Sequence, residues 1–249
     1  MQLHLSTWEE VDSYLATSKG IIIPIGSTEQ HGPNGLIGTD AICPEVIAKA
    51  VGDRTGALVG PTISIGNAQH HLGFSGSVTL RPTTLIAVIK DYVASLARNG
   101  FERFYFLNGH GGNIATIGAA FAEIYADYSM AMPGSNRPQV RCVLKNWWDT
   151  PGVQALSKEL YGDKDGAHAT ASEVSVTQAA YPDSIKKKDM KQAGRAPRAF
   201  ADADDYRKLY PDGRIGSDPT LARPEHGHRL IEASAGDVIE DYRRFLTLD

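Results

Sequence analysis

Three side chains within one short stretch, two carboxylates and an imidazole, are of the types that hold a divalent metal ion. Glu29 and His31 are separated by one residue, and Asp40 follows nine residues after His31. Zn²⁺, Mn²⁺ and Fe²⁺ accept such oxygen and nitrogen ligands. In an extended chain Glu29 and His31 point the same way, so they can address one ion or two adjacent ions. Glycine and proline turn formers before Asp40 can fold it back toward them.

A second motif lies at residues 108–113, with the sequence Asn-Gly-His-Gly-Gly-Asn. A glycine-rich turn between a strand and a helix can cradle a phosphate. This one lacks the lysine and the spacing of a P-loop, so we interpret His110 as a metal ligand instead. Further along, His168 and Glu173 form a third group of ligand-type or proton-transferring residues.

The elements around these motifs alternate between strands and helices. Short apolar runs predict strands at residues 21–25, 57–65, 101–107 and 139–145, with some strand character at 74–80. Helical spacing and capping signals predict helices at residues 7–16, 44–51, 83–99, 114–128, about 171–182, and 224–246. This order indicates a mostly parallel sheet covered by helices on both faces. The loops at 26–40, 66–77, 108–113 and 146–150 should therefore converge on one edge, where ligands bind in such sheets.

The composition excludes several classes of protein. The 249 residues are 42% hydrophobic and 22% charged, with a net charge of -4 and no basic block, which gives no electrostatic reason to expect nucleic acid. Cys43 and Cys142 are far apart and suit a reducing compartment. The N-terminal residues show no secretory signal, and no window approaches 18 apolar residues, so we expect a cytoplasmic protein without a membrane partner.

Some residues near the converging loops keep two interpretations. His70 and His71 are adjacent and should point apart, so at most one should face the site. Trp147 and Trp148 could wall a pocket or belong to the core. Residues 183–223 show little periodicity and are predicted to form a long surface excursion that is either functional or an interface arm. The remaining histidines are expected to be structural or to face solvent: His4, His226 and His228.

Together these motifs resemble the creatininase family of metal-dependent amidohydrolases. The resemblance rests on residues 27–33 (Ser-Thr-Glu-Gln-His-Gly-Pro) with Thr39 and Asp40, on residues 108–113, and on His168 with residues 173–175 (Glu-Val-Ser). Their order and spacing agree from about residue 20 to 180. The resemblance implies that residues 1–249 form a single domain, a three-layer α/β/α sandwich. It also implies two divalent ions per subunit and a homohexamer built as a trimer of dimers.

Carried over by position, the resemblance implies that Glu29 and His110 bind one ion, that His31 binds the other, and that Asp40 bridges them. Glu173 would complete the ligand set and take part in catalysis. Five residues of helix turn ~500°, so His168 should lie at the unwound start of a helix rather than on the face of Glu173. From there its near-neutral pKa would suit proton donation to the departing nitrogen. The alternative is a helix-capping or exposed histidine.

The substrate-contacting residues are expected to be His71, Asn113 and Trp148. Creatininase proper carries Tyr and Glu where this chain has Gly111 and Gly112, and Glu where it has Ala167, so creatinine is not the expected substrate. The Gly-Gly form resembles branches that act on other amides, including a formamidopyrimidine deformylase and a peptide-trimming enzyme. Asn34 stands where many members carry His.

The sequence thus predicts a metal-dependent amidohydrolase that cleaves a C–N bond of a small amide or cyclic amide, with zinc, manganese or iron in two sites. Within the family, the alternative is a formamide deformylase or a peptide-trimming enzyme. Outside it, the alternative is a non-catalytic α/β protein that binds a sugar or a nucleotide. The second alternative is disfavoured because unpaired carboxylates on converging loops would repel one another without a cation.

Overall fold

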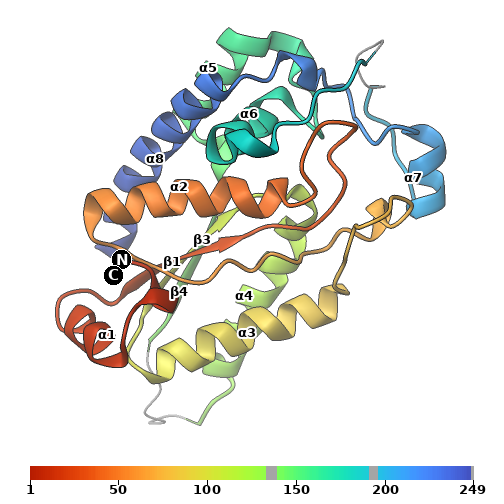
Figure 1. Cartoon of the computed structure of the whole chain (residues 1–249). Coiled ribbons are helices and arrows are strands. Elements are labelled where there is room, and N and C mark those ends of the chain that lie inside the picture. The colour runs from red at the N-terminus through yellow and green to blue at the C-terminus, as the bar shows by residue number, and fades with distance from the viewer. Residues whose placement is uncertain (133–138, 191–195, 248–249) are drawn as a thin grey trace.

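A parallel sheet of four strands lies at the centre of the computed structural model, which describes residues 1–132, 139–190 and 196–247 (Figure 1). The strand order is β2-β1-β3-β4. Their bounds are Gly20–Ile25 for β1, Leu58–Val59 for β2, Arg103–Asn108 for β3 and Arg141–Asn146 for β4. The register places Ile25, Asn108 and Asn146 side by side, so the carboxyl ends of three strands meet at one edge. Every residue of β1 is buried, as expected for a parallel strand with both faces covered.

Helices cover both faces of this sheet (Figure 1). Their bounds are Trp8–Leu15 (α1), Thr39–Thr55 (α2), Pro82–Arg98 (α3), Ile114–Ser129 (α4), Pro151–Tyr161 (α5), Ala171–Ala180 (α6), Ala203–Leu209 (α7) and Pro224–Leu246 (α8). Ile22 of β1 packs in one core with α2, α5, α6 and α8. Its neighbours Ile21 and Ile23 pack in the other core with α1, α3 and α4. The alternation along β1 therefore joins three layers, which confirms the predicted α/β/α class.

Two predicted elements differ in extent from those observed. The strand expected at 57–65 is reduced to Leu58–Val59, with one further bridge between Ile25 and Ile63. Val59 pairs with Ile22, so the segment has one extra residue before Ile63, which interrupts the regular ladder. The helix expected at 44–51 runs from Thr39 to Thr55 and includes Pro44 in its interior. Asp40 consequently lies in the first turn of α2 rather than in the preceding loop.

Other differences concern residues after 70. The segment 74–80 forms only a single bridge, between Val78 and Thr28. Helix α5, for which we predicted nothing, follows β4. Part of the predicted excursion, residues 191–195, lies outside the described residues. Its described parts contain α7 and are not confined to the surface, since Tyr206 and Tyr210 are buried.

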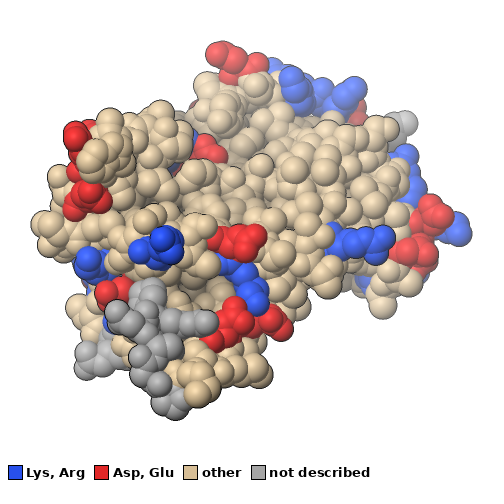
Figure 2. Space-filling model, turned by 90° about the horizontal axis from the view of Figure 1, so that it is seen from below, with Lys and Arg blue, Asp and Glu red and all other residues tan. Residues whose placement is uncertain are grey.

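The surface on the side of α3 carries interspersed charges of both signs. Figure 2 shows acidic and basic side chains alternating there, without a continuous basic area among the described residues of that face. None of the described helices is both long enough and apolar enough to cross a lipid bilayer.

Candidate metal centre

The carboxyl ends of β1 and β3 meet the first turn of α2 at the predicted edge of the sheet. The backbone of Asp40 lies so close to both strand ends that a Cβ atom at Gly26 or at Gly109 would collide with its carbonyl group. Glycine at these two positions therefore allows the helix and the strands to approach each other. The close approach brings Asp40 beside the loop that carries Glu29 and His31 and beside His110, which follows β3 directly.

Asp40 is shared by two groups of ligand-type atoms. One group consists of Glu29, Asp40 and His110, and the other of His31, Asp40 and Glu173; the ligand atoms of each group lie within 4.8 Å of one another. Oδ1 of Asp40 lies 2.8 Å from Nε2 of His31, and Oδ2 lies 2.8 Å from Nδ1 of His110. Oε1 of Glu173 lies 3.8 Å from Nε2 of His31. The five predicted ligands are thus brought together, with Asp40 in the middle.

The hydrogen bonds around the two imidazoles show whether a cation fits between them and Asp40. Nδ1 of His31 lies 3.1 Å from the Glu29 carbonyl, and Nε2 of His110 lies 2.8 Å from the Asn67 carbonyl. Carbonyl groups only accept, so these nitrogens carry hydrogen and the other nitrogen of each neutral ring has a lone pair. Both lone pairs then face Asp40 oxygens, an arrangement that needs a cation or a second ring proton.

Unpaired oxygens point to the same conclusion. Both carboxylate oxygens of Glu29 and Oδ2 of Asp40 are buried and accept no well-aligned hydrogen bond, although ring nitrogens of His71 and His110 lie 2.9 and 2.8 Å from two of them. A buried carboxylate oxygen left without a partner is costly. The donor set of carboxylates and imidazoles fits a divalent ion such as Zn²⁺ or Mn²⁺.

The charges of the cluster shift the pKa values strongly. Burial acts to lower the pKa of His31, but the carboxylates of Asp40 and Glu173 outweigh it and raise this pKa to about 10. His110 behaves in the same way, with its pKa raised to about 9 by Glu29 and Asp40 against burial. Burial also acts to raise the pKa of Asp40, yet the two imidazoles lower it well below its usual range. Burial dominates for Glu29, whose pKa is raised, and for Glu173, whose pKa is raised to about 7.

His168 occupies the unwound segment before α6, as predicted. Its backbone forms an antiparallel bridge with Ile215, and the next residue, Ala169, has a φ of 54°. Nδ1 of His168 lies 3.9 Å from Oε1 of Glu29. The near-neutral pKa that we expected is contradicted, because burial, with His71 and His31, lowers the pKa of His168 well below its ordinary value. The ring is therefore neutral near pH 7 and a weaker base than a free imidazole.

The three predicted substrate contacts differ in position. Trp148 is half-buried and lines a cavity beside the cluster, whereas Trp147 belongs to the core. His71 is buried and places Nε2 2.9 Å from Oε1 of Glu29. Asn113 is fully buried, and its carboxamide binds the backbone of Asn67 and Gly26. The predicted roles of His71 and Asn113 thus do not match their positions, since these side chains hold a ligand and a loop in place.

Histidines 70 and 71 also contradict the expectation that they point apart. They lie in a 3₁₀ turn, Gln69–His71, and their ring centroids are 4.1 Å apart. The His70 ring stacks at 6.4 Å from the His110 ring, so both histidines lie near the cluster. The alternation argument fails because it applies to extended chain and not to this turn.

The cavity beside the cluster has a volume of about 590 Å³. The candidate ligands Asp40, His110 and Glu173 form one side of it, together with His168. The facing wall comes from Trp148, which precedes α5, and from α5 and the segment after it, which contribute Gln154, Ser157, Lys158, Asp163 and Asp165. Sequence reasoning predicted Trp148 in this wall but missed the part from α5, although Pro151 and the spacing of Val153, Leu156 and Leu160 were signals of an amphipathic helix.

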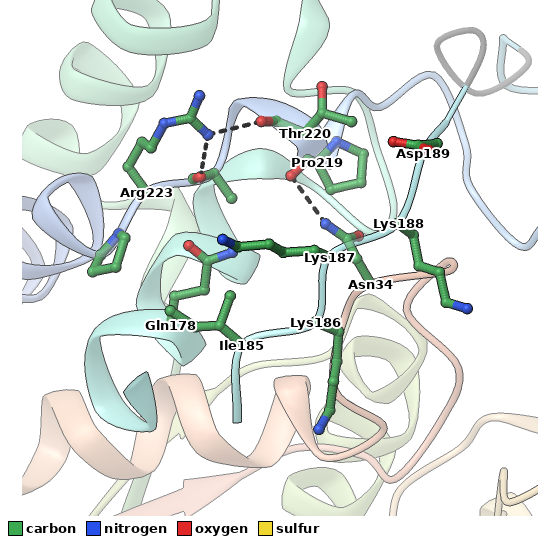
Figure 3. Close-up of a pocket in the computed structure, with 12 residues that line it drawn as sticks. Asn34, Gln178, Ile185, Lys186, Lys187, Lys188, Asp189, Pro219, Thr220 and Arg223 are labelled. Carbon is green, nitrogen blue, oxygen red and sulfur yellow. Dashed lines mark hydrogen bonds between the residues drawn. The ribbon is translucent and has the colours of Figure 1, made fainter. Parts of the chain in front are cut away.

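A second cavity, of about 780 Å³, contains none of the candidate ligands (Figure 3). Asn34 lies there and donates a hydrogen bond from Nδ2 to the carbonyl of Pro219, so it is turned toward this cavity (Figure 3). Lys186 and Lys188 also line it, but Figure 3 shows their side chains projecting in different directions.

Comparison with known proteins agrees with this geometry. Residues 4–241 match the model of the family Creatininase, described as creatinine amidohydrolase. The chain belongs to the creatininase family. Within it, the chain is 28% identical to the creatinine amidohydrolase of Pseudomonas putida, over 95% of this chain and 94% of that one. It is 27% identical to the mycofactocin precursor peptide peptidase of Mycolicibacterium smegmatis, over 90% and 85% of the two chains.

Solved creatininase structures share the whole fold. A mutant creatininase of Zn-Zn type has a TM-score of 0.85 at 24% identity, covering 99% of this chain and 98% of that one. A structure described as creatininase Mn has a TM-score of 0.83 at 25% identity, covering 99% of both chains. The predicted family and fold class are therefore confirmed, and the creatininase relatives named above are hydrolases of C–N bonds.

Proposed function

We propose that the protein is a metal-dependent amidohydrolase that uses two divalent ions per subunit to cleave the C–N bond of a small amide or cyclic amide. The observation that carries the proposal is the position of Asp40, whose two oxygens each face an imidazole nitrogen at 2.8 Å. Glu29, Asp40 and His110 would hold one ion, and His31, Asp40 and Glu173 the other. Zinc, manganese and iron suit these ligands.

The bound ions would supply Lewis acidity, lowering the pKa of water and polarising the amide carbonyl. The protein itself would handle the proton. His168 lines the cavity with its Nδ1 lone pair free, so this atom would take a proton from water, and its lowered pKa would favour passing that proton on to the departing nitrogen. Glu173 has a pKa of about 7 without an ion, and a cation beside it would favour its charged form, as a ligand requires. Trp148 provides a flat apolar wall against which a planar amide can be oriented.

A peptide or a formamide is the second candidate substrate. The cavity volume of about 590 Å³ exceeds what a single small ring requires, and a Cβ atom at Gly111 would meet nothing within 4 Å. One curated relative is named as a peptide peptidase. A cytoplasmic homohexamer, built as a trimer of dimers, remains part of the proposal.

The test combines metal analysis with a substrate screen. Protein purified without chelator is expected to contain two equivalents of zinc, manganese or iron, and to hydrolyse at least one member of a panel of cyclic amides, formamides and short peptides. Asp40→Asn should lose both ions and reduce hydrolysis by more than about 100-fold, because losing even an outer-shell partner of a metal ligand costs ~10–100-fold.

Asp163→Asn is the matched control, because this exposed carboxylate lies on the facing wall, away from the ligand cluster. It should retain both ions. Two ions retained by Asp40→Asn would contradict the bridging role. Wild-type protein that holds no divalent ion and hydrolyses nothing would favour a non-catalytic binding protein.

A further inference from the structure

Gln30 lies in the sequence between the candidate ligands Glu29 and His31 and takes no part in the mechanism above. It is nevertheless buried, with only 6% of its surface exposed. Its Oε1 atom accepts a hydrogen bond of 2.9 Å from the backbone N–H of Gly32. This contact fixes which end of the carboxamide carries the NH₂ group. Nε2 then points at two histidines, His71 and His168, with both distances at 2.9 Å.

The two amide hydrogens of Gln30 can be assigned from the available acceptors. One is directed at the carbonyl of Gly213, at 3.1 Å, which can only accept. The other is directed at Nδ1 of His71, which must then carry a lone pair. The hydrogen of a neutral His71 ring is then on Nε2, because the carboxylate oxygen beside that nitrogen can only accept. That nitrogen lies 2.9 Å from Oε1 of Glu29.

The backbone of Gln30 orients the second ring. Nε2 of His168 lies 2.9 Å from the Gln30 carbonyl, which can only accept, so it donates its hydrogen there. Nδ1 of His168 is left with a lone pair on the side of Glu29. One residue thus fixes both the carboxylate-facing N–H of His71 and the free lone pair of His168.

The segment around α7 holds Gln30 in turn. The hydroxyl of Tyr206, a fully buried residue, donates to the Gly213 carbonyl at 2.8 Å and lies 3.5 Å from Nε2 of Gln30. Gly213 has a φ of 85°, and a Cβ atom there would collide with the Gln30 carboxamide. Two residues later, Ile215 forms the bridge with His168.

We propose that Gln30 is a positioning residue that fixes the ring orientation and the tautomer of His71 and His168, and that Tyr206 and Gly213 hold Gln30 for this purpose. The described parts of residues 183–223, which we call the arm, would then hold His168 in place. This inference rests on the proposed function in so far as Glu29 and His168 act in hydrolysis. The role of the arm is to hold Gln30, and metal binding by the ligand cluster does not depend on it.

The test reads the histidine rings directly. In zinc-loaded protein with ¹⁵N-labelled histidine, long-range ¹H–¹⁵N spectra should show the Nε2–H tautomer for both His71 and His168. Gln30→Met keeps the length of the side chain and removes its hydrogen bonds, so the His71 ring should lose its single tautomer. The His168 ring donates to the backbone carbonyl of residue 30, which the variant keeps, so its Nε2–H tautomer should persist. kcat on the amide found by the screen should fall ~10–100-fold, as for other outer-shell partners, with little change in KM.

A matched pair of tyrosines separates positioning from general loosening of the arm. Tyr206→Phe removes the hydroxyl that braces Gly213, whereas Tyr210→Phe removes a buried hydroxyl that binds the backbone of Arg198 and Ala196 instead. Only Tyr206→Phe should alter the His71 spectrum and lower kcat. Equal effects from both tyrosine variants would overturn the proposal.

The outcomes also distinguish this proposal from the proposed function. An altered His71 tautomer in Gln30→Met with no amide hydrolysed by the wild type would support the positioning role and remove the amidohydrolase proposal. Unchanged ring spectra and unchanged kcat in Gln30→Met would overturn the positioning role and leave the amidohydrolase standing.

Discussion

Two neighbouring glycines beside the cluster differ in what they tolerate. A Cβ atom at Gly112 would collide with the His110 ring and with the carbonyl of Asn67, which orients that ring. At Gly111 the same atom would enter open space on the cavity wall, and the backbone there has no left-handed φ. Gly112 therefore protects the geometry of a ligand, while Gly111 leaves room for substrate.

A side chain at position 111 should accordingly change selectivity and not stability. We expect Gly111→Leu to bind metal as the wild type does and to keep its free energy of unfolding within about 0.5 kcal/mol. It should raise KM for bulky amides more than for small formamides, because the side chain fills part of the cavity. Steady-state kinetics on substrates of graded size would measure this.

Gly118→Leu is the control, since a Cβ atom at this exposed position of α4 also meets nothing within 4 Å but lies outside the cavity. An equal change in KM for small and large amides in Gly111→Leu would contradict the prediction.

Ligand-type residues could be predicted from the sequence because their chemistry is set by their identity. A single turn is enough to bring Glu29, His31 and Asp40 together in space. His110 could be added because it follows a strand that ends at the same edge of the sheet. The roles of His71 and Asn113 could not be predicted in this way. They depend on which atom each side chain meets after a 3₁₀ turn or a buried loop forms, and a linear pattern does not contain that information.

At the scale of elements, the packing of α6 on α8 depends on one glycine. A Cβ atom at Gly227, in the first turns of α8, would collide with the backbone of Ser175 and with Ala179, both in α6. Helix α6 begins shortly after His168 and carries Glu173. The contact between α6 and α8 therefore also determines where Glu173 lies relative to the other candidate ligands.

Gly227→Ala should therefore destabilise the protein by about 1–3 kcal/mol, the usual cost of overpacking. Gly236→Ala, in the same helix, is the control: its Cβ atom would meet nothing within 4 Å, so alanine should stabilise the helix by about 1 kcal/mol. Urea unfolding of both variants would measure the difference. A stabilised Gly227→Ala variant would show that α6 can move away from α8.

Element boundaries were the least predictable part of the fold. The four strand positions and six of the helices follow from periodicity and capping signals. An extra residue before Ile63 interrupts the second strand. Pro44 concealed a helix that begins at Thr39, because a proline is usually a boundary and here lies inside the helix. The arm could not be predicted, since Tyr206 and Tyr210 become buried only against distant loops.

At the scale of the whole molecule, buried tyrosines couple stability to alkaline pH. Burial raises the pKa of the Tyr161 hydroxyl to about 12, and it raises the pKa values of four other hydroxyls further: Tyr92, Tyr105, Tyr206 and Tyr242. In the unfolded chain each would ionise near pH 10. A pKa raised on folding means that the folded state retains protons that the unfolded state releases.

The free energy of unfolding should therefore be insensitive to these groups below about pH 10 and should fall steadily as the pH rises above it. Urea unfolding at increasing pH, with phenolate absorbance recorded in parallel, would measure this. Phenolate from these tyrosines should form only as the protein unfolds. Full tyrosine ionisation in a protein that remains folded would contradict the prediction.

The cavity has two sides of different origin. The ligands come from strand ends and from helix starts packed too tightly for insertion, as Gly26 and Gly109 show. Other lining residues come from Trp148, from α5 and from the segment up to residue 167, and none of these is a candidate ligand. Hydrolytic capacity and substrate choice are thus encoded in different stretches of the gene, so exchanging residues 148–167 between relatives would transplant the preference for an amide without rebuilding the centre that breaks it.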